Sequence, residues 1–208
     1  MKRNHRFLWI VGAVCLLGVV LAGVYFSADK GRQPLDLAAV DNSMPLAEFH
    51  GEKVYPSDVE NQMRSLSATG AAGQKTADEI FMEILHNMVL YDEAVRLGYT
   101  ATQSEIDAMV ENSKQSYATP EGKAMMDQYC EQANLTIDEY FTSLEAQAPR
   151  TIARQKLLDA VGKQYCDEHG LTFTKVNPPA EMIQAREAYV EELFAQAEGD
   201  ITYHTNGS

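Results

Sequence analysis

The chain is poor in the residues that carry most enzyme chemistry and metal binding. It has 3 cysteines and 5 histidines among 208 residues, with no CxxC pair and no two histidines at metal-ligand spacing, so the pattern does not support zinc or thioredoxin-type chemistry. The HExxH, GxSxG, P-loop and GxGxxG motifs are also absent, which excludes the common zincin, hydrolase and nucleotide-binding fingerprints. We therefore expect no catalytic residue, no metal and no cofactor.

Positive charge is scarce as well. The chain has 17 Lys and Arg against 30 Asp and Glu, a formal net charge of −13. Proteins that bind nucleic acid owe most of their affinity to Lys and Arg on phosphates, and no basic stripe is present here. We therefore expect no nucleic-acid partner. The acidic composition is typical of a well-solvated surface.

One long hydrophobic run follows a short basic tail. Residues 7–26 contain no charged residue, and about 20 residues are needed to cross a bilayer core. Signal-peptide hydrophobic regions run to only about 7–15 residues, and the nearest cleavage-like site places Phe26 where a small residue is needed. We therefore predict an uncleaved transmembrane anchor at 7–26 rather than a cleaved signal peptide. Residues 1–6 would lie in the cytoplasm and the bulk of the chain outside the cell membrane.

Two of the three cysteines follow the predicted anchor. Cys15 lies inside the run, whereas Cys130 and Cys166 lie beyond it, where an oxidising compartment permits disulfides. A bridge requires Cα atoms about 4.4–6.8 Å apart, a separation that sequence does not supply. We expect two buried free thiols, with a Cys130–Cys166 disulfide as the alternative.

The remaining chain divides into a linker, a folded region and a tail. Residues 27–45 show no sustained hydrophobic period and contain two prolines, which is typical of a linker. Extended segments on both sides of Gly51 predict a short hairpin at 46–55. We predict one folded domain over 46–197 and a disordered tail over 198–208.

Helical periodicity dominates the predicted domain. A helix is expected from Pro56, three capping boxes begin at Thr76, Thr102 and Thr136, and another helix opens at Thr119-Pro120. Gly98 and Asn134 are expected at helix ends, and Pro149 is expected to kink or split the helix that contains it. A short extended stretch after Gly170 and a last helix at about 180–197 complete the pattern. The predicted fold is mainly α, with a small extended or β element.

This order of elements resembles the SurA N-terminal domain and PrsA-type foldases. The segment FHGEKVYPSDVENQM is similar to their opening hairpin and first helix. The segment EIFMEILHNMVLYDEAVRLGYTATQSEIDAMV is similar to a helix ending in Ala-x-x-Leu-Gly, here Ala94 to Gly98, followed by a capped helix from Thr102. The resemblance covers about residues 47–195.

The resemblance implies a chaperone-like module of bacterial envelopes. Its partners would be unfolded or partly folded exported proteins, and residues 7–26 would bind the lipid bilayer. In full-length foldases of this type a parvulin-like isomerase domain follows, but this chain ends within about a dozen residues of the matched region. We therefore expect no isomerase activity and no other enzyme activity.

Methionine and aromatic residues are the candidate polypeptide-binding set. Methionine side chains are flexible and polarizable, so a Met-rich surface can adapt to different apolar segments. The alternative is that these residues are ordinary core. The predicted binding residues are Phe81, Met88, Tyr91, Met109, Tyr117, Met125, Met126, Tyr140 and Phe141. We expect a holdase or folding factor; the alternative is a helical scaffolding protein that docks one defined envelope partner.

Overall fold

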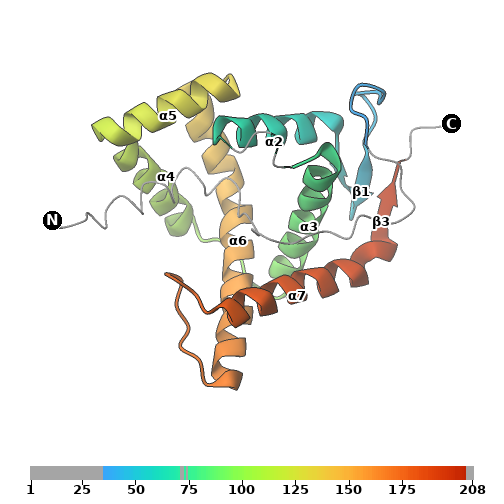
Figure 1. Cartoon of the computed structure of the whole chain (residues 1–208), viewed down its shortest axis with the longest axis vertical. Coiled ribbons are helices and arrows are strands. Elements are labelled where there is room, and N and C mark those ends of the chain that lie inside the picture. The colour runs from blue at the N-terminus through green and yellow to red at the C-terminus, as the bar shows by residue number, and fades with distance from the viewer. Residues whose placement is uncertain (1–34, 71–72, 74, 205–208) are drawn as a thin grey trace. The chain divides into compact units, whose positions relative to one another are not determined.

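The structure is a computed structural model that describes residues 35–70, 73 and 75–204. Six α-helices and one three-stranded sheet form within these residues (Figure 1), which confirms the mainly helical prediction. The predicted single domain divides into two compact units. Of the described residues, unit 1 contains 63–70, 73 and 100–152, and unit 2 contains 35–62, 75–99 and 153–204.

The predicted membrane anchor falls outside the described residues. Residues 1–34 include the basic tail, the run at 7–26 and the first part of the linker. Among the helices of the described ranges, none combines the length and the apolar character that a bilayer span requires. The anchor therefore stays a prediction.

The sheet of unit 2 begins with the predicted hairpin. Strands β1 (Ala47–Phe49) and β2 (Glu52–Val54) pair antiparallel, with Ala47 opposite Val54. The two connecting residues, His50 and Gly51, have φ values of 49° and 83°. Two consecutive positive φ values are typical of the type I′ turn, whose twist matches that of the flanking strands. The hairpin prediction is confirmed.

The third strand corrects the prediction of a disordered tail. After the short 3₁₀ helix η2 (Glu198–Asp200), strand β3 (Ile201–Tyr203) pairs antiparallel with β1, giving the order β2-β1-β3. Ile201 is buried. The tail prediction is therefore wrong for 198–203, because a three-residue strand is too short to show alternation. Pairing with β3 satisfies backbone groups on the second edge of β1. Residues 205–208 lie outside the description.

Helices α3 and α7 pack against each other in unit 2. Helix α3 (Ala77–Arg96) begins at the predicted capping box, in which Thr76 and Glu79 exchange side-chain and backbone hydrogen bonds. Its end is a Schellman motif, because the Tyr99 N–H donates to the Ala94 carbonyl and Gly98 has a φ of 84°. Helix α7 spans Ala180–Ala197, as predicted.

The stretch between Gly170 and α7 forms a loop rather than a strand. Its position is set by Asp159, which is paired with Arg186 at 3.0 Å and also with Lys175. The Arg186 guanidinium lies 5.8 Å from the centre of the Phe173 ring. The hydrophobic residues of this stretch therefore alternate with a period of two although it does not pair with a strand.

Unit 1 is built from parts of four helices. It holds the end of α2 (Pro56–Ala68), all of α4 (Gln103–Tyr117) and α5 (Pro120–Ala133), and the first part of α6 (Ile137–His169). Capping boxes form at Thr102 and Thr136 as predicted, and Asn134 ends α5 in the left-handed conformation. The buried core consists of Val110, Met126, Tyr129, Cys130, Ala133, Tyr140 and Leu144.

A glycine allows the tight corner between α4 and α5. A Cβ atom on Gly122 would lie 1.9 Å from the Ser116 carbonyl oxygen, far inside van der Waals contact. The Gly122 N–H donates to Thr119 Oγ1 at 3.0 Å, which caps α5. The close approach of the two helices at this corner therefore requires glycine.

Helix α6 continues without interruption through Pro149. The predicted split is therefore absent, although proline still removes one backbone donor from the helix. The boundary between the units falls between Ile152 and Ala153, within this helix.

The two cysteines beyond the predicted anchor are buried free thiols. Cys130 lies in α5 of unit 1 and Cys166 lies in α6 of unit 2. No bridge joins them in the structure, which agrees with the expected buried free thiols and not with the alternative of a disulfide. Burial raises the pKa of the Cys130 thiol, which keeps it protonated and unreactive.

Candidate polypeptide-binding groove

A pocket of about 330 Å³ lies in unit 1 between α4 and α6. Five α4 residues line it at spacings of three and four, which places them on one face of the helix. Two residues of α6 complete the lining. The lining residues are Glu105, Ala108, Met109, Asn112, Ser113, Leu144 and Ile152. We call this pocket the α4–α6 groove.

The groove has a buried floor and accessible walls. Leu144 and Ser113 are 4% and 3% exposed and belong to the floor. Met109 and Ile152 are half-buried, and Ala108 is exposed. The walls therefore offer apolar side chains that a ligand can cover, and covering such surface is favourable by about 25 cal/mol per Å².

Aromatic packing supports the floor. Tyr140 is fully buried and meets Tyr129 edge to face at 5.9 Å and Phe141 at 5.3 Å between ring centres. Its hydroxyl lies 3.4 Å from Ser113 Oγ. Burial raises the pKa of Tyr140, so the phenol is neutral. The floor is thus held by contacts that stabilise one arrangement of the side chains.

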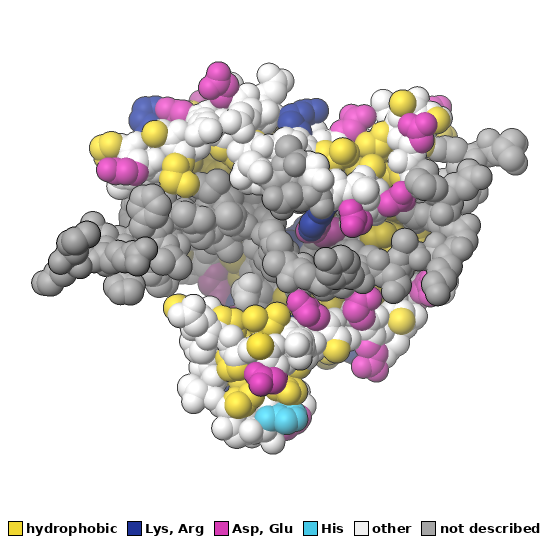
Figure 2. Space-filling view, viewed as in Figure 1, with side chains coloured by type: hydrophobic (Ala, Val, Ile, Leu, Met, Phe, Trp, Pro, Cys, Tyr) yellow, Lys and Arg dark blue, Asp and Glu magenta, His cyan; other side chains and the backbone are white. Residues whose placement is uncertain are grey.

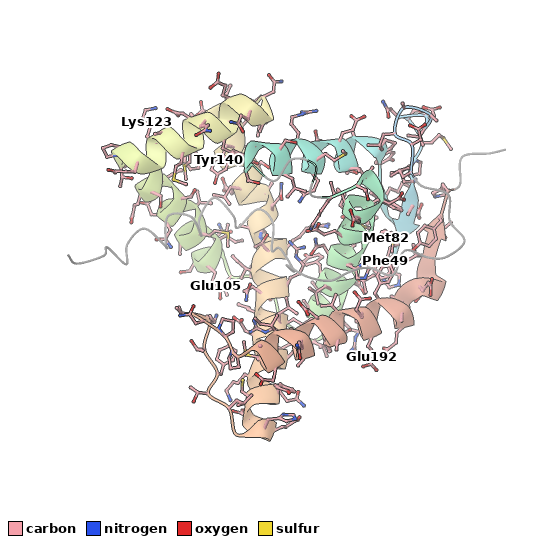
Figure 3. All side chains as sticks on the ribbon, viewed as in Figure 1. Phe49, Met82, Glu105, Lys123, Tyr140 and Glu192 are labelled. Atoms are coloured by element: carbon pink, nitrogen blue, oxygen red, sulfur yellow. The ribbon has the colours of Figure 1, made fainter. Side chains whose placement is uncertain are left out.

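Glu105 is the one ionisable side chain among the seven lining residues. It lies in the first turn of α4 (Figure 3). Its Oε2 atom accepts hydrogen bonds from the Thr102 N–H and hydroxyl, both at 2.8 Å. These hydrogen bonds fix the position of the carboxylate at the start of α4.

The lysines of unit 1 lie on aromatic faces instead of lining the groove. Lys123 Nζ is 4.9 Å from the centre of the Tyr117 ring and 2.6 Å from Asp127 Oδ2. Hydrogen bonds from the Lys123 ammonium to Asp127 and Tyr117 raise the pKa of this lysine. Lys114 Nζ lies 5.8 Å from the centre of the Phe141 ring. Neither lysine is among the lining residues of the groove.

The predicted binding residues are distributed over both units. Phe81, Met88 and Tyr91 belong to unit 2, and the other six belong to unit 1. Four of the nine are buried and therefore belong to the core, as the alternative interpretation expected: Phe81, Met88, Met126 and Tyr140. Tyr91, Met109, Tyr117, Met125 and Phe141 are half-buried. Of the nine, Met109 alone lines the groove.

Sequence reasoning missed six lining residues. The spacing of Glu105, Ala108, Met109, Asn112 and Ser113 was visible as one helix face, but small and polar residues carry little apolar signal. Leu144 and Ile152 are eight positions apart on α6, and no pattern indicated which helix they would face. The helical spacing therefore indicated which α4 residues share a face, but nothing in the sequence indicated that α6 faces them.

No cluster of three or more His, Cys, Asp or Glu with metal-binding geometry occurs among the described residues. His86 is buried and stacks on Phe194 with 3.7 Å between ring centres. Its Nδ1 donates to the Met82 carbonyl at 2.8 Å, and burial lowers its pKa to about 4. This neutral histidine is part of the packing of unit 2.

Comparison with protein-family models, with curated proteins and with solved structures finds no match to this chain.

Proposed function

We propose that the chain is a membrane-anchored, extracytoplasmic chaperone-like protein that binds non-native polypeptides without a chemical step. The supporting observation is the α4–α6 groove, whose half-buried walls offer apolar contacts over a packed floor. Non-native chains expose apolar side chains that a folded protein buries, so such a groove fits them. The resemblance to the SurA N-terminal domain supports the same function.

The groove suits weak and reversible binding. Pockets for small ligands usually range from about 300 to 1,000 Å³, and this one has about 330 Å³. It accommodates a few side chains of an extended segment, not a folded surface. A small contact of this kind favours rapid release, which a chaperone needs.

The second part of the proposal concerns the predicted membrane anchor. Residues 7–26 would hold the folded part beside the membrane through which exported chains emerge. The described helices have acidic surfaces: on the face shown in Figure 2, acidic side chains outnumber basic ones and hydrophobic side chains lie among them. An acidic surface stays away from anionic lipid, so the folded part would remain available to its clients.

The proposal is tested by aggregation assays on the full chain in mild detergent. We expect it to suppress light scattering by several unrelated denatured proteins. The Met109→Gln variant should lose most of that activity, because a polar amide replaces an apolar wall of the groove. Met125→Gln is the matched control, since Met125 is also half-buried in unit 1 but does not line the groove.

Three results would contradict the proposal. One is equal suppression by the two variants, and another is no suppression by the parent chain. The third is a single stoichiometric partner in a crosslinked pull-down together with no effect on denatured proteins. That last result would favour the scaffolding alternative.

A further inference from the structure

We propose that the α4–α6 groove binds extended segments in preference to helical ones, because Asn112 pairs with a peptide group of the bound segment. The Asn112 carboxamide would donate to a backbone carbonyl and accept from a backbone N–H, while an apolar side chain of the segment covers Met109 and Ile152. This inference rests on the proposed function, because it names the class of polypeptide segment that the groove binds.

The first argument is the availability of the Asn112 side chain. Three of the lining residues have polar side chains: Glu105, Asn112 and Ser113. Glu105 takes part in the cap of α4 with Thr102, and Ser113 is buried with its Oγ atom 3.4 Å from the Tyr140 hydroxyl. Asn112 is exposed, and its carboxamide makes no hydrogen bond within the part of the chain that the structure describes. A ligand can therefore use its donor and acceptor atoms.

The second argument is the match between a carboxamide and a peptide group. A carboxamide has an acceptor oxygen and two donor hydrogens, and a peptide group offers one donor and one acceptor. Asn112 lies about one turn after Ala108 and Met109 on the same face of α4. One helical turn is about 5.4 Å long, and successive residues of an extended segment are about 3.3 Å apart. A peptide group one or two residues from the side chain that covers Met109 would therefore reach Asn112.

The third argument is the conformation of the occupant. In a helix most backbone N–H and C=O groups are already bonded within the helix, so a helical segment has few of them to offer Asn112. A helix with its side chains is also about 10–12 Å across, which is too wide to enter a pocket of about 330 Å³. An extended segment offers its backbone groups, and main-chain hydrogen bonds give affinity without regard to side-chain sequence. Binding through Asn112 would therefore suit clients of many sequences.

The test measures binding of fluorescent peptides to the full chain in mild detergent by anisotropy. The parent is an extended apolar peptide. In an ester series each backbone amide is replaced in turn by an ester, which removes one N–H donor, and a further peptide of the same composition is held helical by a side-chain crosslink. We expect one ester to bind about three- to tenfold more weakly than the parent peptide, the range of one hydrogen bond. The helical peptide should bind most weakly.

The variants test whether Asn112 is the partner of that amide. Asn112→Leu keeps a side chain of similar size but removes both the donor and the acceptor, so the sensitive ester and the parent peptide should bind it equally. Gln115→Leu is the matched control, because Gln115 is also an exposed carboxamide of α4 and does not line the groove. Its amide donates to Glu111 Oε1 at 3.0 Å. This control should retain the difference between the parent peptide and its ester.

Each other outcome overturns the inference. Equal binding of the extended and helical peptides, or ester sensitivity that persists in Asn112→Leu, would remove the role of Asn112 while the proposed function stands. Loss of the sensitivity in both variants would likewise show that it does not depend on the groove. If no peptide binds but aggregation is suppressed, clients bind elsewhere on the protein. If no peptide binds and aggregation is not suppressed, the proposed function itself fails.

Discussion

The two compact units are stabilised by different kinds of contact. Unit 2 contains partly buried ion pairs: Asp159 and Arg186 are each 15% exposed, and Lys75 meets Glu83 at 2.6 Å. Unit 1 has an aromatic and aliphatic core, and its Lys123–Asp127 pair is largely exposed. These partly buried charges of unit 2 are paired with one another, whereas unit 1 has a groove with half-buried apolar walls. The comparison indicates that unit 1 is the part suited to ligands.

The largest expected effect concerns the corner of unit 1. Gly122→Ala should destabilise the protein by about 4 kcal/mol, because the added Cβ would overlap a backbone atom that cannot move away cheaply. Urea unfolding followed by circular dichroism measures the loss. Gly199→Ala is the control: a Cβ there meets no atom within 4 Å, and its stability should stay near that of the parent. Equal stability of the two variants would contradict the packing of α4 against α5.

The next effect concerns the ion pairs of unit 2. Arg186→Met should cost about 3 kcal/mol, because it leaves Asp159 largely buried with only Lys175 as a cationic partner. Lys163→Met removes a base from a pair with Asp167 in which both side chains are more than half exposed, and should cost less than about 0.5 kcal/mol. Thermal unfolding of both variants provides the measurement. Similar losses of stability in the two variants would show that the stability of unit 2 does not depend on whether an ion pair is buried.

His86 should make the stability of unit 2 depend on pH between about 4 and 6.5. Its pKa is lowered from 6.5 to about 4 by burial, so between these values the unfolded chain binds a proton that the folded chain does not. Stability therefore falls as the pH drops from 6.5 to 4, by about 2 kcal/mol. Glu191, 3.6 Å from His86 Nε2, offsets part of the loss because burial raises its pKa and it gains a proton in the folded state.

Unfolding curves at pH 7 and pH 4.5 check this dependence. The His86→Leu variant should lose most of the difference between the two curves, whereas His169→Gln, at an exposed site on α6, should keep it. A steeper fall in the His86→Leu variant than in the parent would refute the assignment.

The smallest expected effect compares the same motif in both units. Thr76→Ala and Thr102→Ala each remove a capping box and should each cost about 1 kcal/mol. Only Thr102→Ala should also weaken suppression of aggregation, since α4 supplies five of the seven residues that line the groove. Parallel unfolding and light-scattering measurements separate the two effects. An equal loss of suppression in both variants would mean that general loosening of the protein, not the α4–α6 groove, governs recognition.

Local patterns predicted the helices well. The three Thr-x-x-Glu boxes, the end of α3 at Gly98 and the hairpin at His50-Gly51 all follow from interactions within a few residues. The predictions that failed concerned partners distant in sequence. Strand β3 forms only because β1, about 150 residues earlier in the chain, has an open edge, and the stretch after Gly170 has no such partner.

The sequence by itself determined the helix boundaries, the acidic charge and the absence of common catalytic motifs, because each depends on composition or on neighbours within one turn. Only the tertiary structure decided which apolar residues are core and which are accessible. Met126 and Met109 share the same chemistry, yet one is buried and the other lines the groove. Burial depends on which helix faces each side chain, and that pairing joins residues too far apart for local periodicity to reveal.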